Sequence, residues 1–292
     1  MRFVTFEHGG TVQAGMLTTG PDGDTVLALG HPAFRDVVGP EPNVIDLIRS
    51  GLDGVETRIA AVTAPADAHL PLSKVRLLAP FTPGHIIGAA HNFRDAVAER
   101  KIAPPEKPVT FVKEPSAVAG PTDAIVVPPG IGGVTYEAEL AVVIGRRAEA
   151  VAESEALSYV AGYCVLNDVS ASDVIKADGH FRRGKNFPTF CPMGPALVSA
   201  SEVPDPQNLR VWLAMDGVTL QDGTTADMLF SVATLISVLS ALHPLEPGDV
   251  IATGTPAGVA PMRTPPTWLR PGAVLETEVE GLGRLVNPIV EQ

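Results

Sequence analysis

Two glutamates, separated by a single residue, lie in an apolar part of the chain. Glu137 and Glu139 belong to segment 135–145, which we predict to be a β-strand because it is rich in β-branched and aliphatic residues and glycines flank it. Side chains alternate along a strand, so both carboxylates point to the same side. An exposed edge strand would explain them without any function. The apolar run 142–144 instead indicates burial, where paired carboxylates are costly unless a cation compensates them.

A third carboxylate, Asp168, lies near the end of a second apolar strand predicted over residues 163–170. Three carboxylates without a nearby His or Cys form a hard oxygen site, which favours Mg²⁺, with Mn²⁺ or Ca²⁺ as alternatives, over Zn²⁺. Such a cation leaves positions for a carboxylate oxygen and the neighbouring carbonyl oxygen of a 2-oxo acid, and it acts as a Lewis acid on an enolate. We therefore predict a metal site formed by Glu137, Glu139 and Asp168.

Basic residues in this acidic chain are candidates for contacts with a carboxylate substrate. Lys185 lies in a cluster with Arg182 that either binds substrate carboxylates or forms a solvated loop. Lys113 ends an apolar strand predicted over residues 109–113, where its ammonium group either reaches solvent or faces an anion. Both alternatives stay open on the sequence alone.

A Gly- and Thr-rich turn follows the strand predicted near residue 250. Backbone N–H groups at Gly254 and the hydroxyl of Thr255 could bind a carboxylate, and a plain tight turn is the alternative. The turn is no P-loop, because Gly-Lys-Ser/Thr does not follow it. The chain also has no Gly-x-Ser-x-Gly motif, which argues against a serine hydrolase.

Composition limits the classes of function. The chain has 292 residues, 45% of them hydrophobic and 18% charged, which is enough for a sizeable core. Its net charge of −12 argues against binding nucleic acid or an anionic membrane. Cys164 and Cys191 read as buried thiols in a reducing compartment. The polar turn soon after the N-terminus is unlike a signal peptide, and the most apolar window, 228–242, is too short to span a bilayer. We expect a cytoplasmic protein.

The elements that position these residues are mostly strands. Short strands fill residues 1–30, and a short helix follows Asn43 as its N-cap. A strong 3.6-residue period predicts a helix over about 225–242, and a second helix is expected over 154–161. Regular βαβ alternation is absent, so we predict a predominantly β member of the α+β class. The Pro- and Ala-rich linker before residue 74 divides a small domain, 1–74, from a large one, 75–292.

Several stretches together resemble the fumarylacetoacetate hydrolase (FAH) family. They are 136–145, 160–170, 184–187 with 192–195, and 253–258. The resemblance covers residues 75–292, and residues 1–74 look like the small β-rich N-terminal domain of some members. It implies a mixed β-roll, a homodimer, Mg²⁺ on the three carboxylates, and Lys185 and Thr255 facing the substrate. Known members act on 2-oxo and 1,3-dicarbonyl acids as C–C hydrolases, decarboxylases and isomerases of ring-cleavage products.

The chain departs from the family in its lid helix. In hydrolytic members this helix carries a His and a Glu three residues apart, and the Glu orients the His as the base that activates water. Here Glu99 is present, but Ala96 occupies the histidine position. Further departures are Phe93, Ser172 and Pro188, where the family usually has Tyr, Arg and Asp. These changes weaken hydrolysis specifically.

Other residues could take over the missing role. His91, before the lid helix, and His180, before Lys185, are candidate bases, although an ordinary surface or core histidine is the more common explanation for His180. Asn92 is a candidate N-cap of the lid helix and a candidate substrate contact. An unbroken helix would separate His91 from Glu99 by about 12 Å along its axis, too far for a hydrogen bond.

We therefore expect a Mg²⁺-dependent enzyme that acts on an enolisable 2-oxo or 1,3-dicarbonyl acid. C–C bond hydrolysis of an acylpyruvate-type substrate is the leading interpretation. Isomerisation (tautomerisation) or decarboxylation of related 2-oxo acids is the first alternative, since neither needs an activated water. A homologue that binds metal and a small carboxylate without catalysis is the second.

Overall fold

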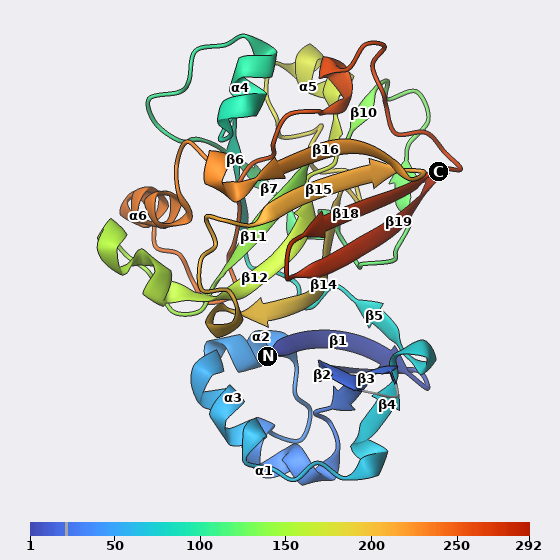
Figure 1. The fold of residues 1–292 in the computed structure, drawn as a ribbon, viewed down its shortest axis with the longest axis vertical. Helices are drawn as coiled ribbons and strands as arrows, with labels where there is room; N and C mark the ends of the chain where they lie inside the picture. Colours follow the sequence, from blue (N-terminus) through green and yellow to red (C-terminus); the bar gives the residue numbers. More distant parts are fainter. Residues whose placement is uncertain (21–22) are drawn as a thin grey trace.

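A computed structural model of the chain describes residues 1–20 and 23–292. Twelve of the described strands form one large sheet (Figure 1). Its order is β4-β3-β2-β1-β14-β12-β11-β17-β6-β7, with β5 beside β1 and β8 beside β14. The bounds are β1 (Arg2–His8), β2 (Thr11–Gly20), β3 (Gly23–Ala28), β4 (His69–Pro71), β5 (Arg76–Leu78), β6 (Ile86–Ala90), β7 (Val109–Lys113), β8 (Val118–Ala119), β11 (Ala138–Ile144), β12 (Val160–Asn167), β14 (Cys191–Ser199) and β17 (Val250–Ala252).

A second sheet has the order β16-β15-β18-β19-β9, and β10 pairs with β13. These strands are β9 (Ile125–Val127), β10 (Val134–Thr135), β13 (Ser170–Ala171), β15 (Arg210–Met215), β16 (Val218–Thr224), β18 (Val274–Val279) and β19 (Gly283–Glu291). The helices are α1 (Arg35–Val38), α2 (Val44–Arg49), α3 (Leu52–Ala60), α4 (Arg94–Arg100), α5 (Ser172–Asp178) and α6 (Val232–Leu242). The predicted class, α+β with mostly strands, is confirmed.

Strands β11 and β12 form the buried centre of the large sheet, and every residue in them is buried. Their apolar sequences explain this, because a strand covered on both faces has no need of polar alternation. The two strands are antiparallel, with Ala138 opposite Asn167. The start of β11 therefore lies beside the end of β12, and Asp168 N–H donates to Glu137 O at 2.9 Å.

The N-terminal strands extend this same sheet. Strand β1 pairs with β14, with Phe3 opposite Leu197. The helix predicted after Asn43 is confirmed as α2, whose Asp46 N–H donates to Asn43 Oδ1 at 2.9 Å. Because the strands before and after residue 74 belong to one hydrogen-bonded sheet, the domain boundary stays a prediction.

Two predicted helices have different bounds in the structure. The long helix begins only at Val232, because the Ser231 hydroxyl caps it by accepting from Thr234 N–H at 3.0 Å. A separate 3₁₀ turn covers Thr225–Asp227. The helix expected over 154–161 is a 3₁₀ helix, Glu153–Tyr159, and the chain then enters strand β12.

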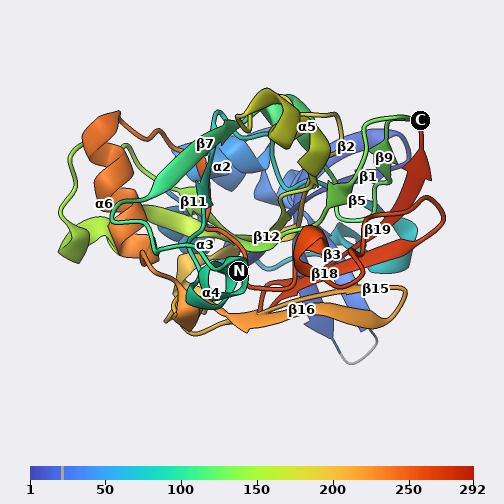
Figure 2. The same cartoon turned by 90° about the horizontal axis from the view of Figure 1, so that it is seen from above.

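Helices α4 and α5 lie at one end of the molecule, the upper end in Figure 1. The view from above in Figure 2 separates them, with α4 and α5 on different sides of the central strands. Both thiols, Cys164 and Cys191, are buried and free, as predicted. Among the described residues, no helix is both long and apolar enough to cross a membrane.

Candidate metal centre and substrate cavity

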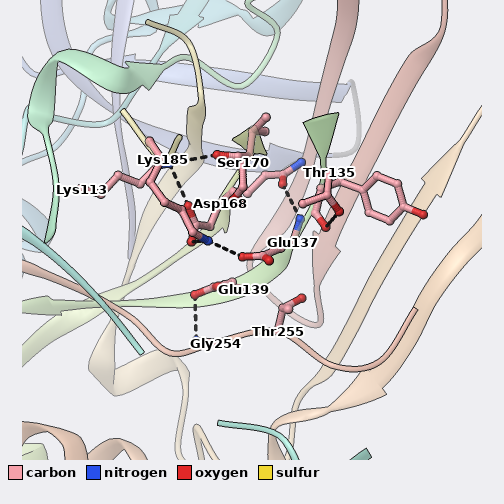
Figure 3. A network of polar contacts seen from close by, with 12 residues as sticks. Lys113, Thr135, Glu137, Glu139, Asp168, Ser170, Lys185, Gly254 and Thr255 are labelled. Carbon is pink, nitrogen blue, oxygen red and sulfur yellow. Dashed lines mark hydrogen bonds and ion pairs between the residues drawn. The ribbon is translucent and has the colours of Figure 1, made fainter. Parts of the chain in front are cut away.

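Three carboxylates meet at the junction of β11 and β12 (Figure 3). Glu137, Glu139 and Asp168 each place one oxygen within 4.8 Å of the others. The antiparallel register brings this about, because Glu137 immediately precedes β11 and Asp168 immediately follows β12. Glu139 Oε2 also accepts the Gly254 N–H at 2.8 Å, which fixes its orientation. The predicted set of three carboxylates is therefore assembled in one place.

The electrostatics of Glu139 indicate that a cation fits here. Its side chain is 2% exposed, and burial together with the carboxylates of Asp168 and Glu137 raises its pKa well above the usual range. Lys185, the nearest compensating charge, does not overcome these effects. A divalent cation on the three oxygens would compensate that charge, and an all-oxygen donor set suits Mg²⁺, Mn²⁺ or Ca²⁺. The residues present therefore fit a hard divalent cation.

Lys185 is the charged partner of two of these carboxylates. Its Nζ lies 2.6 Å from Glu137 Oε2 and also donates to Asp168 Oδ2. Burial alone would lower the pKa of Lys185, but the Asp168 and Glu137 carboxylates outweigh burial and hold the pKa above its ordinary value. The ammonium also lies 4.6 Å from the centre of the Phe111 ring, within the range of a cation–π contact. Lys185 therefore stays positively charged.

Lys113 supports the site from behind. Its side chain is completely buried, and its Nζ lies 2.8 Å from Asp168 Oδ1. The same Nζ donates to Val169 O at 3.2 Å and to Lys185 O. Within the described residues, Asp168 Oδ1 is buried and accepts no hydrogen bond, so only the ion pair with Lys113 compensates it. Burial raises the pKa of Asp168, but Lys113 and Lys185 outweigh it and lower that pKa. The structure places Lys113 behind the carboxylates and outside the cavity lining.

A cavity of about 230 Å³ opens in front of the carboxylates. Its lining comes from five parts of the chain: the β6–α4 segment, β7, the start of β11 with the strand before it, the β13–α5 segment with Lys185, and the segment after β17. Of the residues predicted from sequence, it brings together His91, Glu137, Glu139, Lys185, Gly254 and Thr255. Lining residues that the sequence analysis did not single out include Arg100, Phe111, Thr135, Ser170 and Lys176.

His91 enters the cavity from an unusual backbone conformation. Its φ is +57°, in the left-handed region that few residues other than glycine adopt. The side chain is half-buried, and burial, followed by the charges of Arg100 and Lys185, lowers its pKa. The imidazole is therefore neutral at pH 7 and able to accept a proton. A conformational outlier at a cavity wall is a common mark of a functional residue.

Helix α4 presents two faces to the site. Ala96 and Arg100, one turn apart, line the cavity. Asp95 and Glu99, also one turn apart, face the turn after β17, where Asp95 Oδ2 accepts from Ala257 N–H and Glu99 Oε2 accepts from Gly258 N–H, each at 3.1 Å. Glu99 is thus outside the cavity lining, and its carboxylate holds the turn.

Three other residues predicted to belong to the site do not line the cavity. Asn92 is buried, and its side-chain amide bonds Phe230 N and O and Thr253 O at 2.8–3.0 Å. Its predicted role as N-cap of the lid helix is wrong, because α4 begins at Arg94 and its N-cap is Phe93. His180 and Arg182 line a neighbouring surface hollow with Glu114. Neither is in the lining of the carboxylate cavity.

Comparison of the sequence with known protein families agrees with the fold and the site. A family model described as "Fumarylacetoacetate (FAA) hydrolase C-terminal" matches residues 85–290, so the chain belongs to the fumarylacetoacetate hydrolase family. The protein is therefore an FAH-family enzyme with three carboxylates suited to a metal. Its activity is that of a hydrolase or an isomerase/tautomerase.

Among the similar proteins, some are named as hydrolases and others as isomerases or tautomerases. A fumarylacetoacetate hydrolase domain-containing protein 2 homolog from Dictyostelium discoideum is 42% identical over 75% of this chain and 76% of its own length. The mitochondrial oxaloacetate tautomerase FAHD2A of Bos taurus is 41% identical over 76% of this chain and 71% of its own. The structure of fumarylacetoacetate hydrolase from Exiguobacterium antarcticum superposes with a TM-score of 0.84, at 32% identity and full coverage of both chains.

Proposed function

We propose that this protein is a divalent-metal-dependent tautomerase that interconverts the keto and enol forms of a small 2-oxo acid. The observation that carries the proposal is the composition of the cavity. Its lining includes Glu137, Glu139 and Lys185, but position 96 contributes only a methyl group. Glu99, which would orient a histidine there, instead accepts from Gly258 N–H. The site therefore has the parts for enolisation without the pair that activates water for hydrolysis.

The size of the cavity supports a small substrate. At about 230 Å³ it lies below the roughly 300–1,000 Å³ of typical sites for drug-sized ligands. A 2-oxo acid of a few carbons suits this volume better than an acylpyruvate with a long acyl chain. The bovine relative named oxaloacetate tautomerase, at 41% identity, supports the same substrate class.

Tautomerisation makes few demands on the protein. One proton moves between the enol oxygen and C3, no C–C bond breaks and no water is added. A divalent cation held by Glu137, Glu139 and Asp168 would supply Lewis-acid stabilisation of the enolate. His91, neutral and in the cavity wall, is the group that takes up and returns the proton. Lys185 adds a fixed positive charge beside the oxygen on which negative charge develops.

The test compares two reactions on one preparation. The enol form of oxaloacetate and the C–C substrate acetylpyruvate are each followed by ultraviolet absorbance, with Mg²⁺ and after treatment with a chelator. We expect Mg²⁺-dependent ketonisation at least about 10² faster than acetylpyruvate cleavage, the lower end of what a general base contributes. Cleavage of acetylpyruvate as fast as ketonisation would restore hydrolysis as the main activity.

A further inference from the structure

Arg100 is a cation in the cavity wall that forms no ion pair with an acid of the described residues. Within residues 1–20 and 23–292, no carboxylate oxygen lies within 4.0 Å of its guanidinium group, and its side chain donates no hydrogen bond. Most other arginines of the chain have such partners, for example Arg147, Arg183, Arg210 and Arg284. In a chain with a net charge of −12, a cavity arginine without an acidic partner is available for an external anion.

Arg100 lines the cavity from helix α4, close enough to the metal end for its charge to act on Glu137. It occupies the last turn of α4, one turn after Ala96, and both face the cavity. The metal carboxylates come from the β11–β12 junction, a different wall. A substrate whose carboxylate and 2-oxo group face the metal carboxylates would therefore direct its far end to another wall.

In the part of the chain that the structure describes, the wall formed by α5 contributes no guanidinium group to the cavity. Ser172 lines the cavity there, at the start of the helix. A serine hydroxyl cannot form the bidentate, charge-assisted contact of a guanidinium group with a carboxylate. Arg100 supplies a guanidinium group from α4 instead. Its charge is also felt by His91, which indicates that it is directed into the same space.

We propose that Arg100 binds the second carboxylate of the substrate, so that the protein selects small dicarboxylic 2-oxo acids over monocarboxylic ones. This inference rests on the proposed function, since it takes the first carboxylate and the 2-oxo group to be held at the metal end. Lys176, an exposed residue of α5 that also lines the cavity, adds positive charge near the entrance. Arg100, with its planar fork of donors, fixes the orientation.

The test uses ligands that differ in the second carboxylate. Oxaloacetate has a second carboxylate at its far end, and the enol of phenylpyruvate has an apolar ring there instead. Oxalate consists only of the atoms that would face the metal carboxylates. In Arg100→Gln we expect KM for oxaloacetate to rise about tenfold to hundredfold, the usual loss for a charged hydrogen bond. We expect kcat/KM for phenylpyruvate, and the affinity for oxalate measured by calorimetry with Mg²⁺, to stay within about twofold. Arg100→Lys should recover part of the lost affinity.

Arg94→Gln is the matched control, because Arg94 is exposed on the same helix and does not line the cavity. It should leave all three ligands unaffected. An unchanged KM for oxaloacetate in Arg100→Gln would overturn the inference. An equal loss for oxalate and oxaloacetate would also overturn it, since Arg100 would then act at the metal end. Failure of the natural protein to ketonise any enol would instead contradict the proposed function, and oxaloacetate and oxalate affinities would still test Arg100.

Discussion

Lys113 Nζ lies 2.8 Å from Asp168 Oδ1, and both side chains are completely buried. This pair connects the edge strand β7 to the end of the central strand β12. Lys113 also donates to the main-chain carbonyls of Val169 and Lys185, the two ends of the segment between Asp168 and Asn186. The charge that orients Asp168 is therefore part of the interior of the protein rather than part of the cavity surface.

Replacing Lys113 with methionine keeps the volume but leaves Asp168 without one of its two cations. Removing one partner of a buried ion pair costs about 3–5 kcal/mol, and we expect a loss of that size in the free energy of unfolding. Urea denaturation measures it. Arg210→Met, which breaks the exposed pair with Asp222, is the control and should change stability little. Equal effects of the two substitutions would show that the Lys113 pair is not structural.

Glu139 gives the metal-free protein a specific dependence on pH. Its folded-state pKa is raised, so the folded protein binds more protons than the unfolded chain above the ordinary carboxylate pKa. Stability should therefore fall as pH rises from about 4.5 through the folded pKa. Adding Mg²⁺ should reverse that fall, by about 2.7 kcal/mol at a hundredfold excess over Kd.

Glu139→Gln removes the ionisable group and tests both effects. The variant should have a flatter stability profile without metal and should gain little stability from Mg²⁺, as measured by thermal unfolding across pH. A steep profile retained in Glu139→Gln, or full stabilisation of it by Mg²⁺, would refute the metal assignment.

His91 should determine the acidic side of the pH–rate profile. Burial and the charges of Arg100 and Lys185 lower its pKa, so the neutral imidazole persists below the ordinary value of about 6.5. The rate should therefore stay high as pH falls past 6.5 and drop only below that value. His91→Asn should lower kcat by about 10²–10⁴ and remove this limb. His243→Asn, at the exposed end of α6, is the control; a similar loss in both variants would argue against His91 as the base.

Position 96 should decide how much hydrolysis the site supports. Ala96→His places an imidazole in the cavity wall three residues before Glu99, the spacing that the family resemblance implies for activating water. We expect acetylpyruvate hydrolysis to rise measurably, although the larger side chain costs about 1–3 kcal/mol of stability through overpacking. Ala96→Gln adds volume without a base and should not increase hydrolysis. The idea fails if Ala96→His and Ala96→Gln hydrolyse at the same rate.

Much of the metal site could be predicted from the sequence. Glu137 and Glu139 share a face of a buried apolar strand, and Asp168 ends another, so local patterns were enough to identify them as ligands. Their meeting depends on the register that sets Ala138 opposite Asn167, which is a long-range property. The sequence analysis grouped the three carboxylates by their chemistry, and only the structure shows the strand pairing that brings them together.

The rest of the site depends on tertiary contacts that local sequence does not encode. Asn92 looked like a helix cap, but its amide bonds to the chain near Phe230 and Thr253, more than 130 residues away. Lys113 looked equally able to reach solvent or an anion, and only the packed sheet shows that it is buried. The spacing of Arg100, four residues after Ala96 on a predicted helix, could have placed both on one helix face. Nothing in the sequence indicated that Arg100 would lack an acidic partner.

The central claim is that the site enolises a small 2-oxo acid without breaking a C–C bond. One time course tests it most directly: the Mg²⁺-loaded protein is mixed with the enol form of oxaloacetate, and enol, keto form and pyruvate are followed together by NMR. We predict that enol converts to the keto form well above the buffer rate, and that Glu139→Gln abolishes the acceleration while pyruvate stays at its background level. Enol conversion at the buffer rate, or pyruvate formed as fast as the enol disappears, would contradict the account.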